Sequence, residues 1–305
     1  MIVPTRNRWA RLRAALRGAF AQEGVRVEVI VVDEGSSDET PEGLLSLRRD
    51  ELRVVRNERP RGQATARNQG IEAAGGEWLA FLDDDDLWAP GKLRRQLDAA
   101  SATGAGFAYA SAVVVDEGLR PVELHEAPPA EELGGLLVRG NAVPAGASNV
   151  VAVADLVRRI GGFDDRLNQL TDWDLWIRLA RSAEGARCGE VLLAYLYHRG
   201  NFVLRAAPEI WREFDHVASK HADFARECGA SFDRAGLTFW IAQRQADMGL
   251  RFRSVRTYLR GAFSARRPQH TRLAARTLFL GPPAREASPV IPAPDWLDAY
   301  RDDAG

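Results

Sequence analysis

Four consecutive aspartates at residues 83–86 have the clearest capacity for chemistry in this sequence. They follow an apolar run at 78–82, whose length and composition are typical of a buried strand, so they should lie where that strand leaves its sheet. Adjacent carboxylates repel one another, and a plain turn offers nothing to offset this. A divalent cation would offset it, because hard cations prefer carboxylate oxygens and share them with substrate phosphates. The alternative is a solvated acidic turn that leads into a helix near Pro90.

A second acidic group, Asp33 and Glu34, follows residues 27–32, the clearest strand pattern in the chain. Ligands of open α/β sheets bind outside the carboxyl ends of strands, near the point where the strand order reverses. Both acidic groups are therefore expected at such an edge. Alternatively, Asp33 could serve only to cap the turn after its strand.

The elements that must position these acids alternate between strands and helices over roughly the first 115 residues, as in a doubly wound α/β layer. A helix that contains Arg67 is expected just before the strand of the aspartates. Strands are predicted at 2–3, 27–32, 52–55, 78–82 and 107–115.

The second half of the chain is less regular. Residues 117–146 are rich in proline and glycine and predict a long, partly irregular excursion. A strand-like segment at 148–153, a helix that begins near Thr171 and a strand that ends at His198 follow. The remaining pattern is helical, with helices expected from about 208 and at 234–247, 252–264 and 269–279.

The composition of the chain limits the classes of function to which these residues can belong. With 305 residues, 46% of them hydrophobic, the chain can bury a sizeable core. A net charge of −1 provides no global field for nucleic acid, so no nucleic-acid partner is expected. Cys188 and Cys228 suggest neither a metal site nor a disulfide framework, which fits a reducing cytoplasm. The first residues do not resemble a signal peptide, and no apolar stretch approaches the roughly 18 residues that span a bilayer.

Six short motifs, in order over about residues 2 to 200, resemble family 2 glycosyltransferases, which are inverting enzymes of the GT-A fold. Each motif alone is weak, but six in this order are a specific signal. Four motifs resemble the nucleotide-sugar half of that family: Pro4-Thr5-Arg6-Asn7-Arg8, Val31-Val32-Asp33-Glu34-Gly35-Ser36-Ser37-Asp38, Ala66-Arg67-Asn68-Gln69-Gly70 and Phe81-Leu82-Asp83-Asp84-Asp85-Asp86. The acceptor half is resembled by Gly161-Gly162-Phe163-Asp164 and Asp172-Trp173-Asp174-Leu175-Trp176-Ile177-Arg178.

The resemblance implies an α/β fold with a GT-A-type, Rossmann-like mixed sheet flanked by helices, and a helical C-terminal region. It divides the chain into a catalytic domain at 1–205, with a nucleotide-sugar half at 1–116 and an acceptor half at 117–205. A helical region at 206–280 and a proline-rich tail at 281–305 would follow. The tail is expected to be poorly ordered or draped on the surface.

For the nucleotide, the resemblance implies that Pro4, Thr5 and Arg6 line the pocket of the base and ribose. Asp33 and Glu34 stand where the family usually has two aspartates, the second of which meets the uracil-like edge of the base. The longer Glu34 side chain could shift the nucleotide preference.

For the metal, the resemblance implies that Asp83 and Asp85 form the family's Asp-x-Asp, with Asp85 as the direct ligand of Mn²⁺ or Mg²⁺. Asp84 would lie near the ribose or the metal, and Arg67 would approach the diphosphate. His198 could join the metal or diphosphate site, although a lone histidine is more often structural. Arg67 could equally lie on a solvated helix face.

For the acceptor, Asp172 falls where the family places its catalytic base. Glycosyl transfer needs such a carboxylate, because the acceptor hydroxyl must lose its proton as it attacks. The family's usual Glu-Asp pair has Thr171 in place of the glutamate. Thr171 and Asp174 also have the spacing of a capping box, so this motif could be only a helix start.

The sequence thus predicts a metal-dependent inverting glycosyltransferase, of the hexosyl or a related class, in glycan, polysaccharide or metabolite biosynthesis. The donor would be a nucleoside-diphosphate sugar, with UDP favoured, and the acceptor a hydroxyl of a glycan, a lipid-linked sugar or a small molecule. A cytoplasmic protein is expected, and the arginine-rich C-terminal third is compatible with contact to the inner membrane face. Homo-oligomer formation is left open.

Two alternatives remain. One is a non-catalytic sugar-nucleotide-binding or scaffold protein that kept the fold. The other is a sugar nucleotidyltransferase, which would want a glycine-rich phosphate loop after the first strand, and residues 4–8 contain no glycine.

Overall fold

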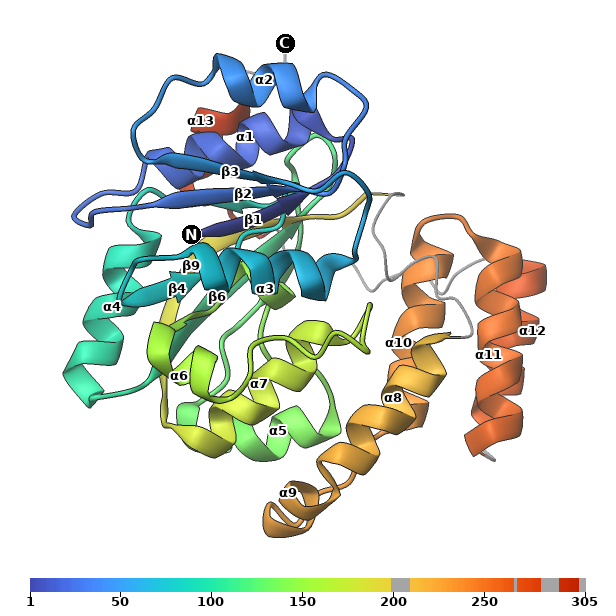
Figure 1. Cartoon of the computed structure of the whole chain (residues 1–305). Helices are drawn as coiled ribbons and strands as arrows, with labels where there is room; N and C mark the ends of the chain where they lie inside the picture. Colours follow the sequence, from blue (N-terminus) through green and yellow to red (C-terminus); the bar gives the residue numbers. More distant parts are fainter. Residues whose placement is uncertain (199–208, 266–267, 281–290, 302–305) are drawn as a thin grey trace. The chain divides into compact units, whose positions relative to one another are not determined.

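The computed structural model of the chain describes residues 1–198, 209–265, 268–280 and 291–301. They belong to two compact units (Figure 1). The first unit contains Met1–Leu137, Asn141–Leu196 and the described end of the chain from Ile291. The second unit contains Val138–Gly140 and the helices after Tyr197.

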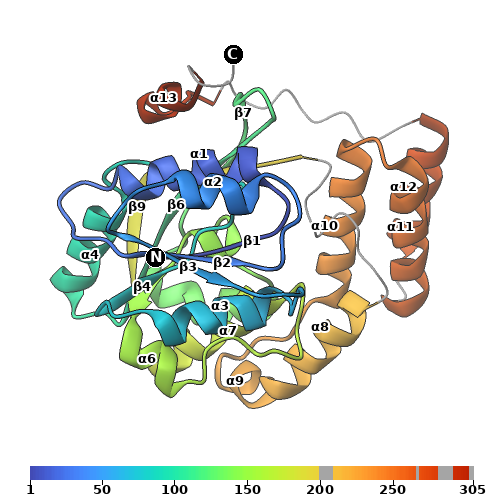
Figure 2. The ribbon, with the colours of Figure 1, turned by 45° about the horizontal axis from the view of Figure 1, so that its top comes forward.

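Three parallel strands form one side of the sheet in the first unit: β1 (Ile2–Thr5), β2 (Val29–Asp33) and β3 (Leu52–Arg56). Helices α1 (Trp9–Phe20) and α2 (Thr40–Ser46) cover one face of these strands, and α3 (Gln63–Ala73) covers the other (Figures 1 and 2). Every residue of β2 is buried, as expected for a parallel strand covered on both faces.

The strands that follow complete a mixed sheet. The short β4 (Trp78–Ala80) pairs antiparallel with β8 (Val151–Val153), which pairs antiparallel with β6 (Phe107–Val115). Next comes β9 (Gly185–Leu196), parallel to β6, and then β5 (Leu87–Trp88), antiparallel to β9.

The two parts of the sheet meet between β1 and the residues just after β4. Ile2 forms a parallel bridge with Phe81, and its carbonyl oxygen accepts a hydrogen bond from Leu82 N at 3.0 Å. The strand order therefore reverses beside the four aspartates, where ligands of open α/β sheets bind. The predicted mixed sheet flanked by helices is confirmed, with α4 (Lys92–Thr103), α6 (Ala154–Arg159) and α7 (Thr171–Ser182) as further helices.

The long, partly irregular excursion expected at 117–146 contains more regular structure than its proline and glycine content indicated. It contains β7 (Pro121–His125), a hairpin partner of β6, the single turn η1 (Ala130–Glu132), and α5 (Leu133–Arg139). Leu133 and Leu137 are buried, so this segment has a hydrophobic anchor of its own that the proline and glycine content obscured.

The strand expected at 148–153 is shorter than predicted. Residues Gly146–Ser148 form the 3₁₀ turn η2, and only β8 is extended. The Asn149 side chain takes the place of a strand partner. Its Oδ1 accepts a hydrogen bond from Ala110 N, and its Nδ2 donates one to Ala110 O, each at 2.7 Å.

The second unit is helical, as predicted. It contains α8 (Glu209–Lys220), α9 (Ala222–Glu227), α10 (Arg234–Asp247), α11 (Arg251–Ala265) and α12 (Pro268–Leu280). The last three lie side by side (Figure 2) around the buried side chains of Ala242, Tyr258 and Ala274. Among the helices that the structure describes, none has both the length and the apolar character to cross a bilayer.

The described part of the predicted tail packs on the first unit. Residues 291–301 include the turn η4 (Asp295–Leu297) and the short helix α13 (Asp298–Arg301), with Leu297 fully buried. Tyr300 Oη donates a hydrogen bond to Trp88 O at 2.8 Å. Residues 281–290 and 302–305, on which the rest of the tail prediction falls, lie outside the described residues.

Candidate active site

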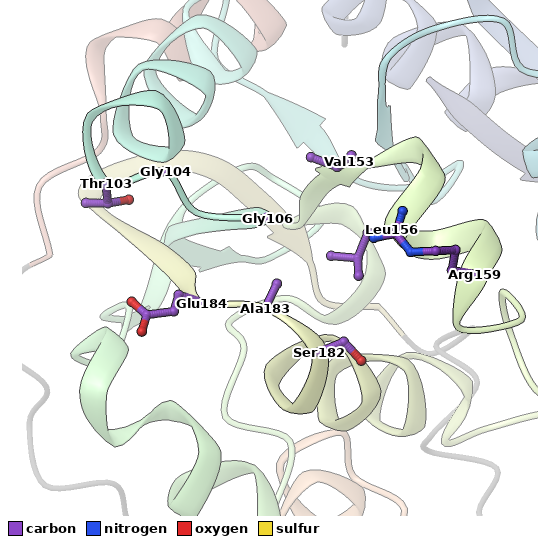
Figure 3. A pocket seen from close by; sticks show the side chains of 9 residues that line it. All are labelled: Thr103, Gly104, Gly106, Val153, Leu156, Arg159, Ser182, Ala183 and Glu184. Atoms are coloured by element: carbon purple, nitrogen blue, oxygen red, sulfur yellow. The ribbon is translucent and has the colours of Figure 1, made fainter.

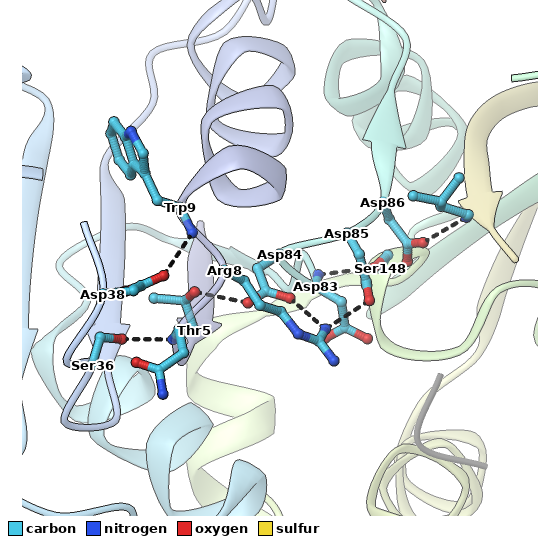
Figure 4. Close-up of polar contacts among 12 residues, drawn as sticks. Thr5, Arg8, Trp9, Ser36, Asp38, Asp83, Asp84, Asp85, Asp86 and Ser148 are labelled. Carbon is cyan, nitrogen blue, oxygen red and sulfur yellow. Dashed lines mark hydrogen bonds and ion pairs between the residues drawn. The ribbon is translucent and has the colours of Figure 1, made fainter. Parts of the chain in front are cut away.

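The four aspartates form the turn between β4 and β5 (Figure 4). Asp86 N donates to Asp83 O at 3.2 Å, and Asp83 N donates to Ser148 Oγ at 2.9 Å. Asp86 is fully buried, and its Oδ1 accepts a hydrogen bond from Leu196 N at 3.2 Å. Burial, and then the charges of Asp85 and Asp83, raise its pKa well above the usual value.

Asp84 ties this turn to the end of β1. Thr5 Oγ1 donates to its Oδ2 at 2.7 Å, and Arg8 Nη1 donates to its Oδ1 at 3.0 Å. Burial, followed by the charge of Asp85, raises the pKa of Asp84 to about 7, although Arg8 and Thr5 oppose the rise. The contact forms because both segments leave the sheet at the point where the strand order reverses.

Arg8 is a functional candidate that we did not predict as a site residue. Its Nη1 also donates to Asp85 Oδ2 at 2.8 Å, so one guanidinium lies across two carboxylates where a divalent cation was expected (Figure 4). The side chain of Arg8 is 34% exposed to solvent, whereas that of Asp85 is 10% exposed. The place of Arg8 immediately before α1, three residues after the end of β1, was the available signal.

Arg67 links the aspartate turn to the predicted acceptor motif. Its Nη2 donates to Asp83 Oδ1 at 2.5 Å, and its Nη1 donates to Thr171 Oγ1 at 3.2 Å. Its guanidinium carbon lies 5.2 Å from the centre of the Phe163 ring. Because Arg67 is only 2% exposed, the alternative of a solvated helix face is wrong.

Two further residues of the 66–70 motif on α3, Asn68 and Gly70, contact neighbouring segments. Asn68 bonds both backbone groups of Phe163, with Nδ2 donating to the carbonyl and Oδ1 accepting from the amide, each at 2.8 Å. Gly70 packs so closely on Ile2 of β1 that a Cβ at this position would clash with it. The helix therefore fixes the 161–164 turn and β1 relative to each other.

Asp172, the predicted base, lies in the first turn of α7 and is half-buried. Asn141 Nδ2 donates to its Oδ2 at 2.9 Å, and a Cβ placed on Gly146 would lie 2.6 Å from the same oxygen. Burial raises the pKa of Asp172, while the charge of Arg67 and the Asn141 hydrogen bond lower it. Neither Asn141 nor Gly146 was predicted, because both fall in the segment expected to be irregular.

The capping-box interpretation of this motif is wrong. Thr171 is the first helical residue, and the N-cap, Leu170, makes no side-chain capping bond. Thr171 instead accepts the hydrogen bond from Arg67. Asp174 is fully buried, and its Oδ2 accepts from Arg178 Nε at 2.9 Å and from Nη2 at 2.7 Å.

Asp33 is fully buried at the end of β2 and has two partners there. Its Oδ1 accepts from Ser36 N at 2.9 Å, which closes the turn, and its Oδ2 accepts from Arg56 Nη1 at 2.8 Å. The turn role that we left open is thus part of what this residue does, and its contact with a base stays a prediction.

Asp33→Ala should lower the free energy of unfolding by about 1–3 kcal/mol, because it removes the acceptor of the Ser36 amide and of Arg56 Nη1. Urea denaturation measures this loss. Asp50→Ala, at an exposed position of the first unit, serves as the control and should stay within about 0.5 kcal/mol of the wild type. Equal stability of the two variants would contradict the structural role.

Glu34 organises the segment that leads into α3. Its Oε2 accepts from Arg61 N at 2.6 Å and from Gly62 N at 2.7 Å, and its Oε1 accepts from Asn57 Nδ2 at 2.5 Å. A shorter aspartate would reach these donors less well, which gives the extra methylene of Glu34 a structural reason.

The remaining predicted residues differ in their placement. Thr5 is buried, Pro4 is half-buried and Arg6 is exposed after β1. His198 is buried and belongs to the second unit, so its part in a metal or diphosphate site stays a prediction. Within the described parts of the chain, no three His, Cys, Asp or Glu side chains gather closely enough to hold a metal ion by themselves.

A surface hollow of about 370 Å³ lies elsewhere in the first unit (Figure 3). It is lined by the end of α4, by Leu156 and Arg159 of α6, and by Ser182 at the end of α7. None of the predicted site residues lines it, so it is separate from the candidate active site.

Two curated relatives match parts of the chain. Succinoglycan biosynthesis protein ExoO of Rhizobium meliloti is 46% identical over 101 residues, which are 33% of this chain and 29% of ExoO. UDP-Glc:alpha-D-GlcNAc-diphosphoundecaprenol beta-1,3-glucosyltransferase WfgD of Escherichia coli is 29% identical over 116 residues, 38% of this chain and 46% of WfgD. The chain thus spans less than half the length of either relative.

Two solved structures share the fold over nearly the whole chain. S. aureus TarS 1–349 in complex with UDP-GlcNAc has a TM-score of 0.62 and 15% identity, over 93% of this chain and 92% of that one. Mannosyltransferase PcManGT from Pyrobaculum calidifontis, in complex with GDP-Man and Mn²⁺, has a TM-score of 0.55 and 19% identity, over 92% and 80%. The predicted GT-A fold is confirmed.

The family model described as glycosyl transferase family 2 matches residues 1–159. This range includes the aspartate turn, α3 and the Asn141–Ser148 segment that contacts Asp172 and Asp83. Because the match covers more than half of the 305 residues, the chain belongs to glycosyl transferase family 2.

Proposed function

We propose that this protein is a metal-dependent inverting glycosyltransferase that moves a sugar from a nucleoside-diphosphate sugar to an acceptor hydroxyl. One observation carries the proposal: Arg67 joins Asp83, at the donor end, to Thr171, which precedes the predicted base Asp172. A charged group for the leaving diphosphate and a carboxylate for the acceptor therefore lie on either side of one buried arginine. Family membership supports the same reading.

The carboxylates of the aspartate turn suit a divalent cation that also binds the diphosphate. Asp85 and Asp83 would hold it, since their side chains are 10% and 31% exposed whereas Asp86 is fully buried. Two protein carboxylates with substrate phosphates form a common Mg²⁺ environment, and PcManGT was solved with Mn²⁺. When bound, the cation would neutralise charge that develops on the leaving group. Arg8 would have to release Asp85 for this to happen.

The chain's own residues would carry the rest of the reaction. The acceptor oxygen attacks the anomeric carbon as the bond to the nucleoside diphosphate breaks, and Asp172 takes the hydroxyl proton. Arg67 keeps a fixed cation beside Asp83 and so holds the donor end in place. Arg67 donates a hydrogen bond to Thr171, which gives that threonine a positioning role. The presence of Thr171 in place of the family's usual glutamate is therefore weaker support for a non-catalytic scaffold protein.

A UDP-sugar donor and a lipid-linked acceptor are the substrates that we favour. WfgD is named for UDP-Glc and a diphosphoundecaprenol-linked acceptor, and TarS was solved with UDP-GlcNAc. Succinoglycan biosynthesis, for which ExoO is named, points to polysaccharide assembly as the setting. We place this reaction in the cytoplasm.

Thermal stabilisation by nucleotide sugars tests the proposal. A panel of UDP-, GDP- and TDP-sugars should include at least one that raises the melting temperature with Mn²⁺ or Mg²⁺ and not with EDTA. A UDP-sugar is the expected match, and its hydrolysis should then release UDP. Absence of metal-dependent stabilisation by every donor would contradict the proposal.

Asn141→Ala should move the acidic limb of the pH–rate profile to higher pH. The Asn141 hydrogen bond lowers the pKa of Asp172, so its removal raises that pKa further above the ordinary value. A base acts only when deprotonated, and activity would therefore be lost at a higher pH as the solution is acidified. The measurement is kcat/KM against pH, with the exposed Asn168→Ala as control. Superimposable profiles for Asn141→Ala and the wild type would contradict the assignment.

A further inference from the structure

The strongest charge imbalance of the chain lies over residues 251–280, and α11 and α12 of the second unit contain six of the arginines in this range. Residues 251–280 contain eight arginines and no lysine, aspartate or glutamate. The whole chain has a net charge of −1, so all other residues together carry −9. A helical hairpin with this much unopposed positive charge is an electrostatic feature in its own right.

One face of α11 combines that charge with exposed apolar groups. Phe252 is 80% exposed and Leu259 is 38% exposed. Arg253, Arg256 and Arg260 are exposed as well, and all five residues fall on one side of the helix at a period of 3.6 residues. We call these five residues the α11 face.

The other side of α11 is occupied by contacts within the unit. Ser254 Oγ donates to Ala242 O at 2.7 Å, and Thr257 Oγ1 donates to Gln245 Oε1 at 2.8 Å. Tyr258 is fully buried. These contacts with α10 fix the orientation of α11 about its own axis. The α11 face lies on the opposite side of the helix and is therefore exposed.

Helix α12 extends the basic surface. It packs on α11 through a hydrogen bond from Arg251 Nε to Thr277 O at 2.5 Å and through the buried Ala274. Arg272 and Arg276 are exposed, and Leu278 is 36% exposed. Both helices therefore pair arginines with exposed aliphatic or aromatic side chains.

We propose that the α11 face docks on an anionic lipid bilayer. Arginines attract anionic headgroups, while an exposed phenylalanine and leucine gain from insertion at the boundary between headgroups and acyl chains. Arginine stems can lie along the apolar boundary while the guanidinium groups stay at the headgroups. A nucleic-acid backbone would match the charge but leave Leu259 and Leu278 without an apolar partner. This docking goes beyond the proposed transfer reaction and does not depend on it.

The test is co-sedimentation of the full chain with phosphatidylcholine vesicles, with and without phosphatidylglycerol. We expect binding only when phosphatidylglycerol is present, and release at high salt because exposed charges are then screened. The triple variant R253Q/R256Q/R260Q should lose affinity by roughly 100-fold, since each arginine near an anionic surface contributes about fivefold. The triple variant R13Q/R48Q/R159Q makes the same charge change at exposed positions of the first unit and should bind as the wild type does.

A second variant keeps the test decisive if the triple variant unfolds. Phe252→Ser changes a side chain that is 80% exposed, so its melting temperature should match the wild type while vesicle affinity falls several-fold. UDP binding measured on the same samples should be unchanged, which separates this proposal from the transferase assignment. Equal binding to pure phosphatidylcholine vesicles, or an equal loss of vesicle affinity in both triple variants, would overturn the proposal. Binding of the wild-type chain to RNA but not to the vesicles would overturn it as well.

Discussion

Asp172→Asn should lower the rate of sugar transfer by roughly 10²- to 10⁴-fold and leave nucleotide affinity unchanged. The amide keeps the size of the carboxylate and one of its two acceptor oxygens, which now bond Asn141 Nδ2 and Trp173 N, but it cannot take the acceptor proton. Donor binding should persist, because the groups assigned to the nucleotide belong to other segments, chiefly the ends of β1 and β2 and the aspartate turn. Transfer rate and UDP affinity, measured on the same preparation, separate the two effects.

Asp174→Asn is the matched control, two residues along the same helix. Asp174 is fully buried and pairs with Arg178, which also donates to Ile160 O. Breaking one side of a buried ion pair costs about 3–5 kcal/mol, so this variant should lose stability while the folded fraction keeps turnover. A wild-type transfer rate in Asp172→Asn, or abolished transfer in folded Asp174→Asn alone, would show that the base is wrongly assigned.

Asp85→Ala should weaken UDP binding in the presence of Mn²⁺ by at least about tenfold, to the level seen with EDTA. Asp85 is the carboxylate through which we expect the cation to bridge the protein and the diphosphate. Calorimetric titration of UDP into protein, with Mn²⁺ and with EDTA, measures the difference.

The exposed Asp98 on α4 provides a control of equal charge change, since it pairs with Arg94 in an i,i+4 surface contact. Asp98→Ala should retain full metal-dependent affinity. UDP affinity that is identical with Mn²⁺ and with EDTA in the wild type would remove the basis for a metal site at Asp85.

Much of the donor side could be predicted because it depends on local patterns. Apolar runs identify strands, and acids directly after two of them fall at the same edge of the sheet. The contact of Thr5 with Asp84 follows from that logic, since both residues leave strands beside the reversal of strand order. The helical second unit was also predictable from its periodicity, with helix limits within about two residues.

The partners of these residues could not be predicted in the same way. Arg8 lies 77 positions from Asp85, and Asn141 lies 31 positions from Asp172. Such contacts depend on how segments cross in space, and neither partner belongs to a pattern of its own. Asn141 was further obscured by a glycine- and proline-rich segment that in fact contains β7 and α5.

Asp33 illustrates a different limit. The sequence allowed both a turn role and a nucleotide role, and the types of the residues did not separate them. The structure shows that Arg56, at the end of the neighbouring β3, reaches the second oxygen of Asp33, which depends on the register of Asp33 with Arg56 in the parallel pair.

The most direct test of the proposed function is a transfer reaction followed by NMR. Purified protein would be incubated with Mn²⁺, the UDP-sugar that stabilises it best and a GlcNAc-diphosphate-lipid acceptor, and the product's anomeric configuration compared with that of the donor. We predict stoichiometric release of UDP and a β-linked product from an α-linked donor, as inversion with Asp172 as base requires. A product with the donor's α configuration, or no transfer from any nucleotide sugar to any hydroxyl acceptor, would contradict the proposal.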